Sequence, residues 1–105
     1  MKRLLISTAL AVTVAGAAQA ETIGVSMALF DDNFLTVLRN GMIAQAEAMD
    51  GVDIQVEDAQ NDVAKQLDQI NNFIAAGVKA IIVNPVDTSA TQAMSDAAAK
   101  ANIPL

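Results

Sequence analysis

Three polar segments of the sequence combine carboxylates, amides and an aromatic ring. They read Asp-Asp-Asn-Phe at residues 31–34, Asp-Ala-Gln-Asn-Asp at residues 58–62 and Asn-Pro-Val-Asp at residues 84–87. A neutral polyol would suit such groups, because its hydroxyls donate hydrogen bonds to carboxylates and amides while its C–H face lies against an aromatic ring. The side chains that we expect to line such a site are Asp32, Phe34, Asn61, Asp87 and Phe30.

Each of these residues also has a purely structural interpretation, which the sequence leaves open. Asp32, Asp62 and Asp87 precede predicted helices, where a carboxylate caps free N–H groups and contributes about 0.5 to 2 kcal/mol. Phe34 could pack the first turn of its helix in the core. Asn61 could bond to the backbone of its own turn. The combination of these groups on three loops is what favours a binding site.

The segments that must position these loops alternate between strand and helix patterns. Apolar or alternating runs predict strands at residues 22–29, 53–57 and 78–83, the third of them central. Apolar stripes at spacings of three and four predict helices over residues 33–49, 63–76 and 88–101. Residues 103–105 have the pattern of a fourth strand that is just beginning.

Strands that alternate with helices pair in parallel through right-handed crossovers. We therefore predict an α/β fold with a parallel doubly wound, Rossmann-like sheet, in which the first strand lies between the second and the third. Ligands of such sheets bind beyond the carboxyl ends of the strands, at the point where the strand order reverses. The three polar loops would then lie along one edge of the sheet.

The first 20 residues have the composition of a secretory signal peptide. A basic start is followed by an apolar run over residues 4–18 and by Ala18-Gln19-Ala20 before Glu21. The run of about 15 residues is shorter than the roughly 20 that span a bilayer, so a cleaved signal peptide is favoured over a membrane anchor. Residues 21–105 would then form the folded part, located in the periplasm.

Beyond residue 20 the chain is strongly acidic, with four basic against twelve acidic residues and a net charge of −8. Such a charge repels phosphate backbones and anionic lipid, which argues against nucleic acid as a partner. Cysteine and histidine are absent from the sequence. Their absence excludes disulfides and removes the commonest general base and the commonest transition-metal ligand. We expect no cofactor, no bound metal and no enzymatic activity.

The three loops, with Gln-Leu-Asp-Gln-Ile at residues 66–70 and Ala-Asn-Ile-Pro at residues 101–104, resemble segments of the periplasmic sugar-binding proteins of ABC transporters. That group binds galactose, glucose, ribose and inositol-type ligands. The resemblance covers residues 21–105 in order and implies a soluble, monomeric receptor that captures a monosaccharide or polyol and delivers it to a membrane permease. It also implies roles: Asp32 accepts hydrogen bonds from sugar hydroxyls, Phe34 stacks on the sugar ring, and Asn61 and Asp87 line or support the cleft.

The chain departs from the family pattern in ways that leave its ligand open. Ala28 stands where the family often has an aromatic or hydroxyl group, and Leu35 where ribose binders carry a second aromatic. Galactose or glucose fits the first loop best, with inositol and ribose close behind. Family members have two lobes joined by a hinge, so residues 21–105 resemble part of the N-terminal lobe. Because tight binding buries most of a small ligand, we predict that this chain alone binds sugar weakly or not at all.

Other functions share parts of the pattern. A receiver-like phosphoacceptor would use Asp31, Asp32 and Asp87 to hold Mg²⁺, but secretion would separate it from cytosolic phosphodonors, and Asp87 lies beyond Pro85. The sugar-sensing core of a LacI-like repressor would need a basic helix-turn-helix segment where the signal sequence stands. Glycoside hydrolysis needs two carboxylates at a suitable span, and adjacent Asp31 and Asp32 point in different directions.

Overall fold

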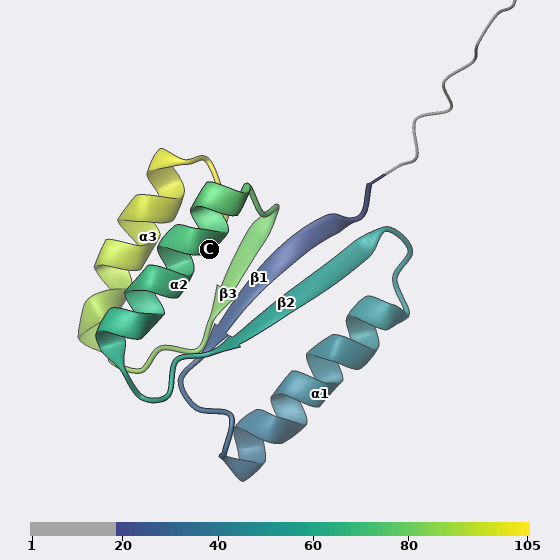
Figure 1. Ribbon diagram of the computed structural model, residues 1–105, viewed down its shortest axis with the longest axis horizontal. Helices are drawn as coiled ribbons and strands as arrows, with labels where there is room; N and C mark the ends of the chain where they lie inside the picture. The colour runs from purple at the N-terminus through teal and green to yellow at the C-terminus, as the bar shows by residue number, and fades with distance from the viewer. Residues whose placement is uncertain (1–18) are drawn as a thin grey trace, which may run out of the picture.

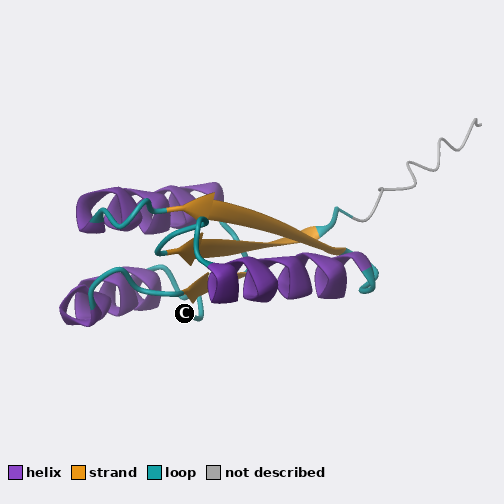
Figure 2. Cartoon of the chain, turned by 90° about the horizontal axis from the view of Figure 1, so that it is seen from below, coloured by secondary structure: helices purple, strands orange, loops and turns teal. Residues whose placement is uncertain are grey.

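The computed structural model describes residues 19–105, which form a parallel sheet with helices on both sides (Figure 1, Figure 2). The order is β1 (Glu21–Met27), α1 (Asn33–Glu47), β2 (Val52–Asp58), α2 (Val63–Ala76), β3 (Ala80–Val83), the 3₁₀ helix η1 (Thr88–Ala90) and α3 (Thr91–Lys100). The α/β fold predicted from the sequence is confirmed. The predicted signal peptide lies outside the described residues apart from its last two. None of the helices described is long and apolar enough to cross a membrane.

The sheet has the strand order β2-β1-β3, and both pairs are parallel. In the register, Ile23 of β1 lies opposite Ile54 of β2 and Ala80 of β3. The predicted position of the first strand between the second and the third is therefore confirmed. Its nearly continuous apolar sequence fits a strand that has helices on both faces.

The third strand was predicted to be central, yet β3 lies at the edge of the sheet formed by residues 19–105. Residues 103–105 are not part of a strand, but they lie on the outer side of β3. There the N–H of Ile81 donates to the carbonyl of Pro104 at 2.9 Å. This bond lies where the predicted fourth strand would begin to pair with β3.

Carboxylates cap the starts of the helical segments, as the sequence predicted. Oδ1 of Asp32 accepts from the N–H of Leu35 at 2.8 Å, and Oδ1 of Asp62 accepts from the N–H of Lys65 at 3.0 Å. The third helix begins later than residue 88. Its first turn, η1, is closed by the N–H of Ala90 on the carbonyl of Asp87, three residues back. Such i→i+3 bonding makes the turn 3₁₀ before α3 begins.

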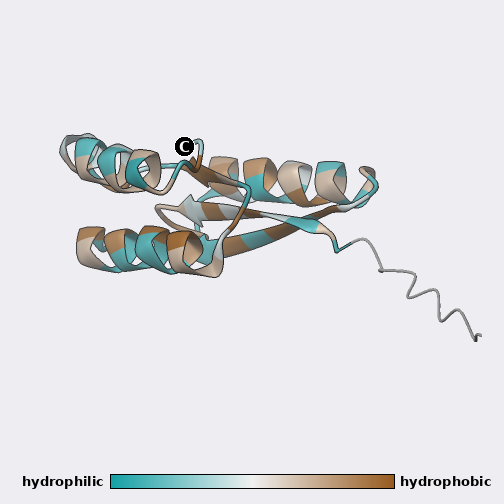
Figure 3. Cartoon of the chain, turned by 90° about the horizontal axis from the view of Figure 1, so that it is seen from above, coloured by the Kyte–Doolittle hydropathy of each residue, from teal (hydrophilic) through white to brown (hydrophobic). Residues whose placement is uncertain are grey.

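A compact core fills the side of the sheet that α2 and α3 cover, called here the closed face. Its buried members are Ile70, Phe73, Val78, Ile81 and Met94. β1 passes close to α2 because it carries Gly24 there: a Cβ atom at this position would lie 2.6 Å from Cγ of Phe73. The helices carry hydrophobic and hydrophilic residues on different sides (Figure 3), as amphipathic helices on a sheet must.

The opposite side of the sheet, called here the open face, is covered by α1, which lies beside β2 (Figure 1). The predicted apolar stripe of this helix is only partly buried. Ala46 is buried, but Leu38 and Met49 are exposed, and so is Ile82 of β3. The stripe has the predicted spacing, but α1 is alone on this face and does not cover the part near β3.

Candidate functional site

Three loops meet at the carboxyl edge of the sheet and form what we call the rim, residues 28–34, 58–61 and 84–87. The backbone holds the two outer loops against the end of β1. The N–H of Asn61 donates to the carbonyl of Ala28 at 2.7 Å, and the N–H of Asn84 donates to the carbonyl of Ser26 at 2.9 Å. The three loops therefore lie at the carboxyl edge of the sheet, as the sequence predicted.

Two side chains that were not among the predicted site residues strengthen this junction. Oδ1 of Asp58 accepts from the N–H of Phe30 at 3.2 Å and from the N–H of Gln60 at 2.9 Å. Oδ1 of Asn84 accepts from the N–H of Ala28 at 3.1 Å. Asp58 and Asn84 stand at the ends of β2 and β3, and that position was the signal available in the sequence.

The carboxylates predicted to bind ligand, Asp32 and Asp87, are exposed at the rim and act as caps. The hydroxyl and the N–H of Ser89 both donate to Oδ1 of Asp87, at 2.7 Å and 2.8 Å. These two bonds hold the pKa of Asp87 below its ordinary value. In both carboxylates the bonds engage Oδ1, so Oδ2 has no protein donor within residues 19–105.

The aromatic rings of the rim have different surroundings. Phe34 is 74% exposed, so the interpretation of this residue as core is wrong. Phe30 is half-buried, and the guanidinium of Arg39 lies over its ring, 4.0 Å from the centroid. Such a contact is attractive because the ring face is negative. Arg39, nine residues along the chain, was not predicted at the rim, and a lone basic residue on a helix gives no signal for it.

Asn61 lies in the turn after β2, but no hydrogen bond of its side chain to that turn is present in the described residues. It adopts a φ of 56° after Gln60 at 53°, a left-handed conformation that asparagine tolerates better than most residues. Its side chain is exposed at the rim. Four of the five predicted site residues thus lie on loops at one edge of the sheet, and the fifth, Phe34, lies in the first turn of α1 beside them. No hydrogen bond joins their side chains to one another in the described chain.

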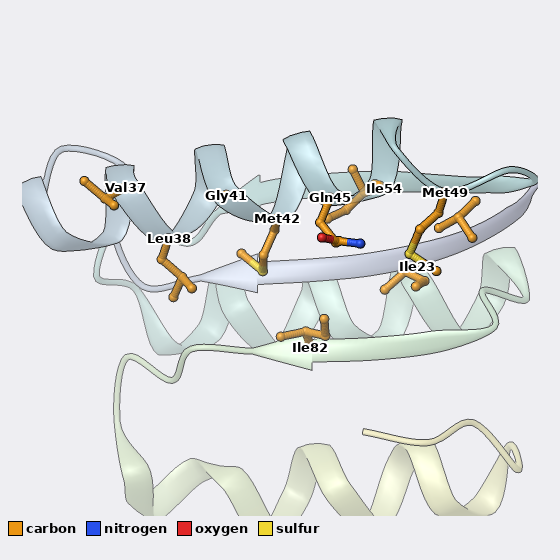
Figure 4. A pocket seen from close by; sticks show the side chains of 11 residues that line it. Ile23, Val37, Leu38, Gly41, Met42, Gln45, Met49, Ile54 and Ile82 are labelled. Carbon is orange, nitrogen blue, oxygen red and sulfur yellow. The ribbon is translucent and has the colours of Figure 1, made fainter.

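A groove of about 450 Å³ lies between α1 and the sheet on the open face. Ile23, Leu38, Met42 and Ile82 line it, and Gln45 is its polar member (Figure 4). None of the predicted site residues lines it. A polyol needs several convergent polar groups, so the groove does not suit such a ligand.

The receiver interpretation requires three acidic side chains that converge on a metal ion. Within residues 19–105, no group of three acidic side chains is arranged to hold one. Asp32 and Asp87 instead cap two different helical segments. This arrangement disfavours the receiver interpretation.

The sequence from residue 23 to residue 105 matches the family described as the periplasmic binding protein domain. The chain belongs to this family. A protein of Rhizobium meliloti, named provisionally a rhizopine-binding protein, is 66% identical over all 105 residues, which cover 34% of its length. The D-galactose/methyl-galactoside binding periplasmic protein of Haemophilus influenzae is 32% identical, with 100% of this chain and 34% of that protein aligned.

Solved structures of binding proteins agree with this assignment. An ABC transporter solute binding protein from Bacillus halodurans, with bound myo-inositol, superposes with a TM-score of 0.78 at 38% identity. The superposition covers 85% of this chain and 31% of that chain. The chain thus spans about a third of the length of the relatives it matches. These relatives are named as binding proteins, in agreement with the expectation of a non-catalytic function.

Proposed function

We propose that the chain is the amino-terminal part of a solute receptor of an ABC importer, which captures a monosaccharide or related polyol and delivers it to a membrane permease. Residues 1–20 would direct it to the periplasm as a cleaved signal peptide. The observation that carries this proposal is the rim, where three loops of a periplasmic binding protein domain bring acceptors and an exposed ring to one edge.

The rim has the chemistry that a polyol requires. Because a cap bond fixes Oδ1 of Asp32 and of Asp87, each carboxylate is already oriented before a ligand arrives. Oδ2 can then accept from a hydroxyl, and bonds to a charged acceptor are stronger than neutral ones. Phe34 offers a bare ring for the C–H face of a sugar. Phe30 has Arg39 over its ring, so we assign Phe30 a supporting place rather than a stacking one.

An inositol-type polyol is the ligand class that we now place first, ahead of the galactose or glucose that the first loop favoured. A structure with bound myo-inositol aligns at 38% identity, above the 32% of the galactoside-binding relative. Ala28 is small and Leu35 is aliphatic, so these two positions add no aromatic or hydroxyl group to the rim. An inositol is a carbocyclic polyol without an anomeric hydroxyl, so no group is required there to recognise one.

The experiment is a chimera in which this chain replaces the aligned third of the Rhizobium meliloti relative. The two sequences are 66% identical over that length, so about two positions in three are unchanged by the exchange. Isothermal titration is run with myo-inositol, galactose, glucose and ribose. We expect micromolar binding of at least one of them. A folded chimera that binds none of the four contradicts the proposal. The 105-residue chain alone should give weak binding or none, because one lobe leaves most of the ligand in water.

An Asp32→Asn variant of the chimera tests the assigned role of the carboxylate. Asparagine caps a helix as well as aspartate, so stability should change little. Loss of the charged acceptor should weaken sugar binding by about tenfold or more. Asp53→Asn is the matched control, because it removes the same charge at the opposite end of β2, away from the rim. Equal affinities for the two variants would remove Asp32 from the site.

A further inference from the structure

Three polar side chains are buried beneath the rim, on the closed face of the sheet. Ser26 and Gln66 are wholly inaccessible, and Gln69 is nearly so. A buried amide or hydroxyl is costly unless its hydrogen bonds are made. Among the residues that the structure describes, every buried polar side-chain atom has a partner.

The partners form one continuous chain of hydrogen bonds that crosses β1. The N–H of Val86 donates to Oε1 of Gln66 at 2.8 Å, and Nε2 of Gln66 donates to Oγ of Ser26 at 3.0 Å. Oγ of Ser26 donates to Oε1 of Gln69 at 2.8 Å, and Nε2 of Gln69 donates to the carbonyl of Asp58 at 2.8 Å. The chain therefore runs from the loop after β3 to the end of β2.

The direction of every donor in this chain is fixed by its two ends. A backbone N–H can only donate, so the oxygen of the Gln66 amide must face Val86. A backbone carbonyl can only accept, so the nitrogen of the Gln69 amide must face Asp58. The hydroxyl of Ser26 then accepts from one amide and donates to the other. Bonds aligned in this way polarise and strengthen one another.

Gln66 makes one further bond to the same loop. Its Nε2 also donates to the carbonyl of Asn84 at 3.0 Å, so a single side chain holds two points of the loop after β3. Asn84 in turn bonds the N–H of Ala28 in the first loop. All three loops of the rim are thus connected by hydrogen bonds that involve Gln66, Gln69 and Asn84.

We propose that Gln66 and Gln69 of α2 are positioning residues of the rim, which set the places of the loops after β2 and β3 on either side of β1. The step from loop position to ligand affinity rests on the proposed function. Asn61 and Asp87, predicted to line the cleft, lie three residues beyond the carbonyls that these amides hold, Asp58 and Asn84. A shift of either loop would move them relative to Asp32 and Phe34.

The first experiment measures loop order in the 105-residue chain by amide hydrogen exchange. Gln66→Met keeps the length of the side chain and removes its three hydrogen bonds. We expect exchange at Val86 to accelerate by about tenfold or more, because its N–H loses its acceptor. Protection at Val25, in the central strand, should fall only as far as global stability falls. Gln92→Met, an exposed change on α3 whose amide bonds Asp96 in the same helix, should alter neither.

The second experiment measures affinity in the chimera with the sugar that binds it best. Gln66→Met should weaken binding by about tenfold. Phe73→Leu is the matched control, since it loosens the core of the closed face without touching a rim contact, and should leave affinity unchanged while both proteins are folded. A merely structural role would lower stability in both variants and affinity in neither.

The proposal is overturned if Val86 and Val25 lose protection in equal proportion, or if Gln66→Met binds sugar as well as Phe73→Leu does. Failure of the proposed function has a different result. In that case the unsubstituted chimera binds no sugar, while hydrogen exchange at Val86 still decides whether the buried amides order the rim.

Discussion

The two faces of the sheet differ in how completely they are covered. On the closed face Phe73 is 2% exposed and the core is continuous from α2 to α3. On the open face Val37 of α1 is 71% exposed and Ile82 of β3 is 45% exposed. Both faces carry apolar residues at regular spacing. The difference shows that a hydrophobic pattern indicates what can be buried, while the arrangement of helices decides what is.

The handedness of the crossovers explains the arrangement. The chain passes from β1 to β2 in one direction and from β2 back past β1 to β3 in the other. With right-handed crossovers at both steps, α1 and α2 must lie on opposite faces. α3 then packs beside α2, which leaves α1 alone on the open face. The buried hydrogen-bonded amides and the exposed apolar groove are therefore on opposite faces of the sheet. The amides belong to α2 on the closed face, and the groove lies between α1 and the sheet on the open face.

Removal of a large side chain should distinguish the two faces most strongly. Phe73→Ala should lower the free energy of unfolding by about 3 to 5 kcal/mol, since it removes a buried ring and leaves a cavity. Ile82→Ala should cost about 1 kcal/mol, because nearly half of that side chain is already in water. Urea denaturation of the 105-residue chain measures both. Similar losses would mean that the open face is covered in solution.

Addition of one methyl group should change stability in opposite directions on the two faces. Gly24→Ala places a Cβ 2.6 Å from the Phe73 ring, and the resulting overpacking should cost about 1 to 3 kcal/mol. Gly41→Ala on α1 meets nothing within 4 Å. Since glycine in a helix interior is about 1 kcal/mol less favourable than alanine, this variant should be stabilised. Thermal unfolding of both variants measures these changes in stability. A stabilising Gly24→Ala would contradict the close packing of β1 on α2.

The order of elements and the helix caps could be predicted from the sequence because their causes are local. The residue that caps α1, Asp32, lies three positions before its donor, and the glycine that ends α2, Gly77, has the left-handed conformation expected of it. The parallel pairing of the strands followed from the alternation of strands and helices. These features depend on neighbours within a few residues or on general rules of handedness.

The buried amides and the ring contact could not be predicted, because their causes are distant in the chain. Gln66 and Gln69 meet Ser26 across 40 and 43 residues, and only the fold brings them together. In the sequence they are polar residues on an amphipathic helix, where exposure is the usual outcome. Arg39 meets the ring of Phe30 only because the first loop turns back over α1. The exposure of Phe34 could not be predicted either, because it depends on which distant segments of the chain pack near the start of α1.

Titration of Asp87 gives the smallest expected effect and tests whether the order of the closed face reaches the exposed rim. The Ser89 hydroxyl and N–H stabilise the ionised carboxylate, so its pKa in the folded chain lies below the unfolded value. The resulting stabilisation is present above the unfolded pKa and is lost as pH falls through the folded pKa. Carbon-detected NMR should find the midpoint below that of an unfolded peptide. Ser89→Ala should raise it, and Ser95→Ala on α3 should not. An Asp87 midpoint unmoved by Ser89→Ala would mean that the rim loop is not ordered in solution at this residue.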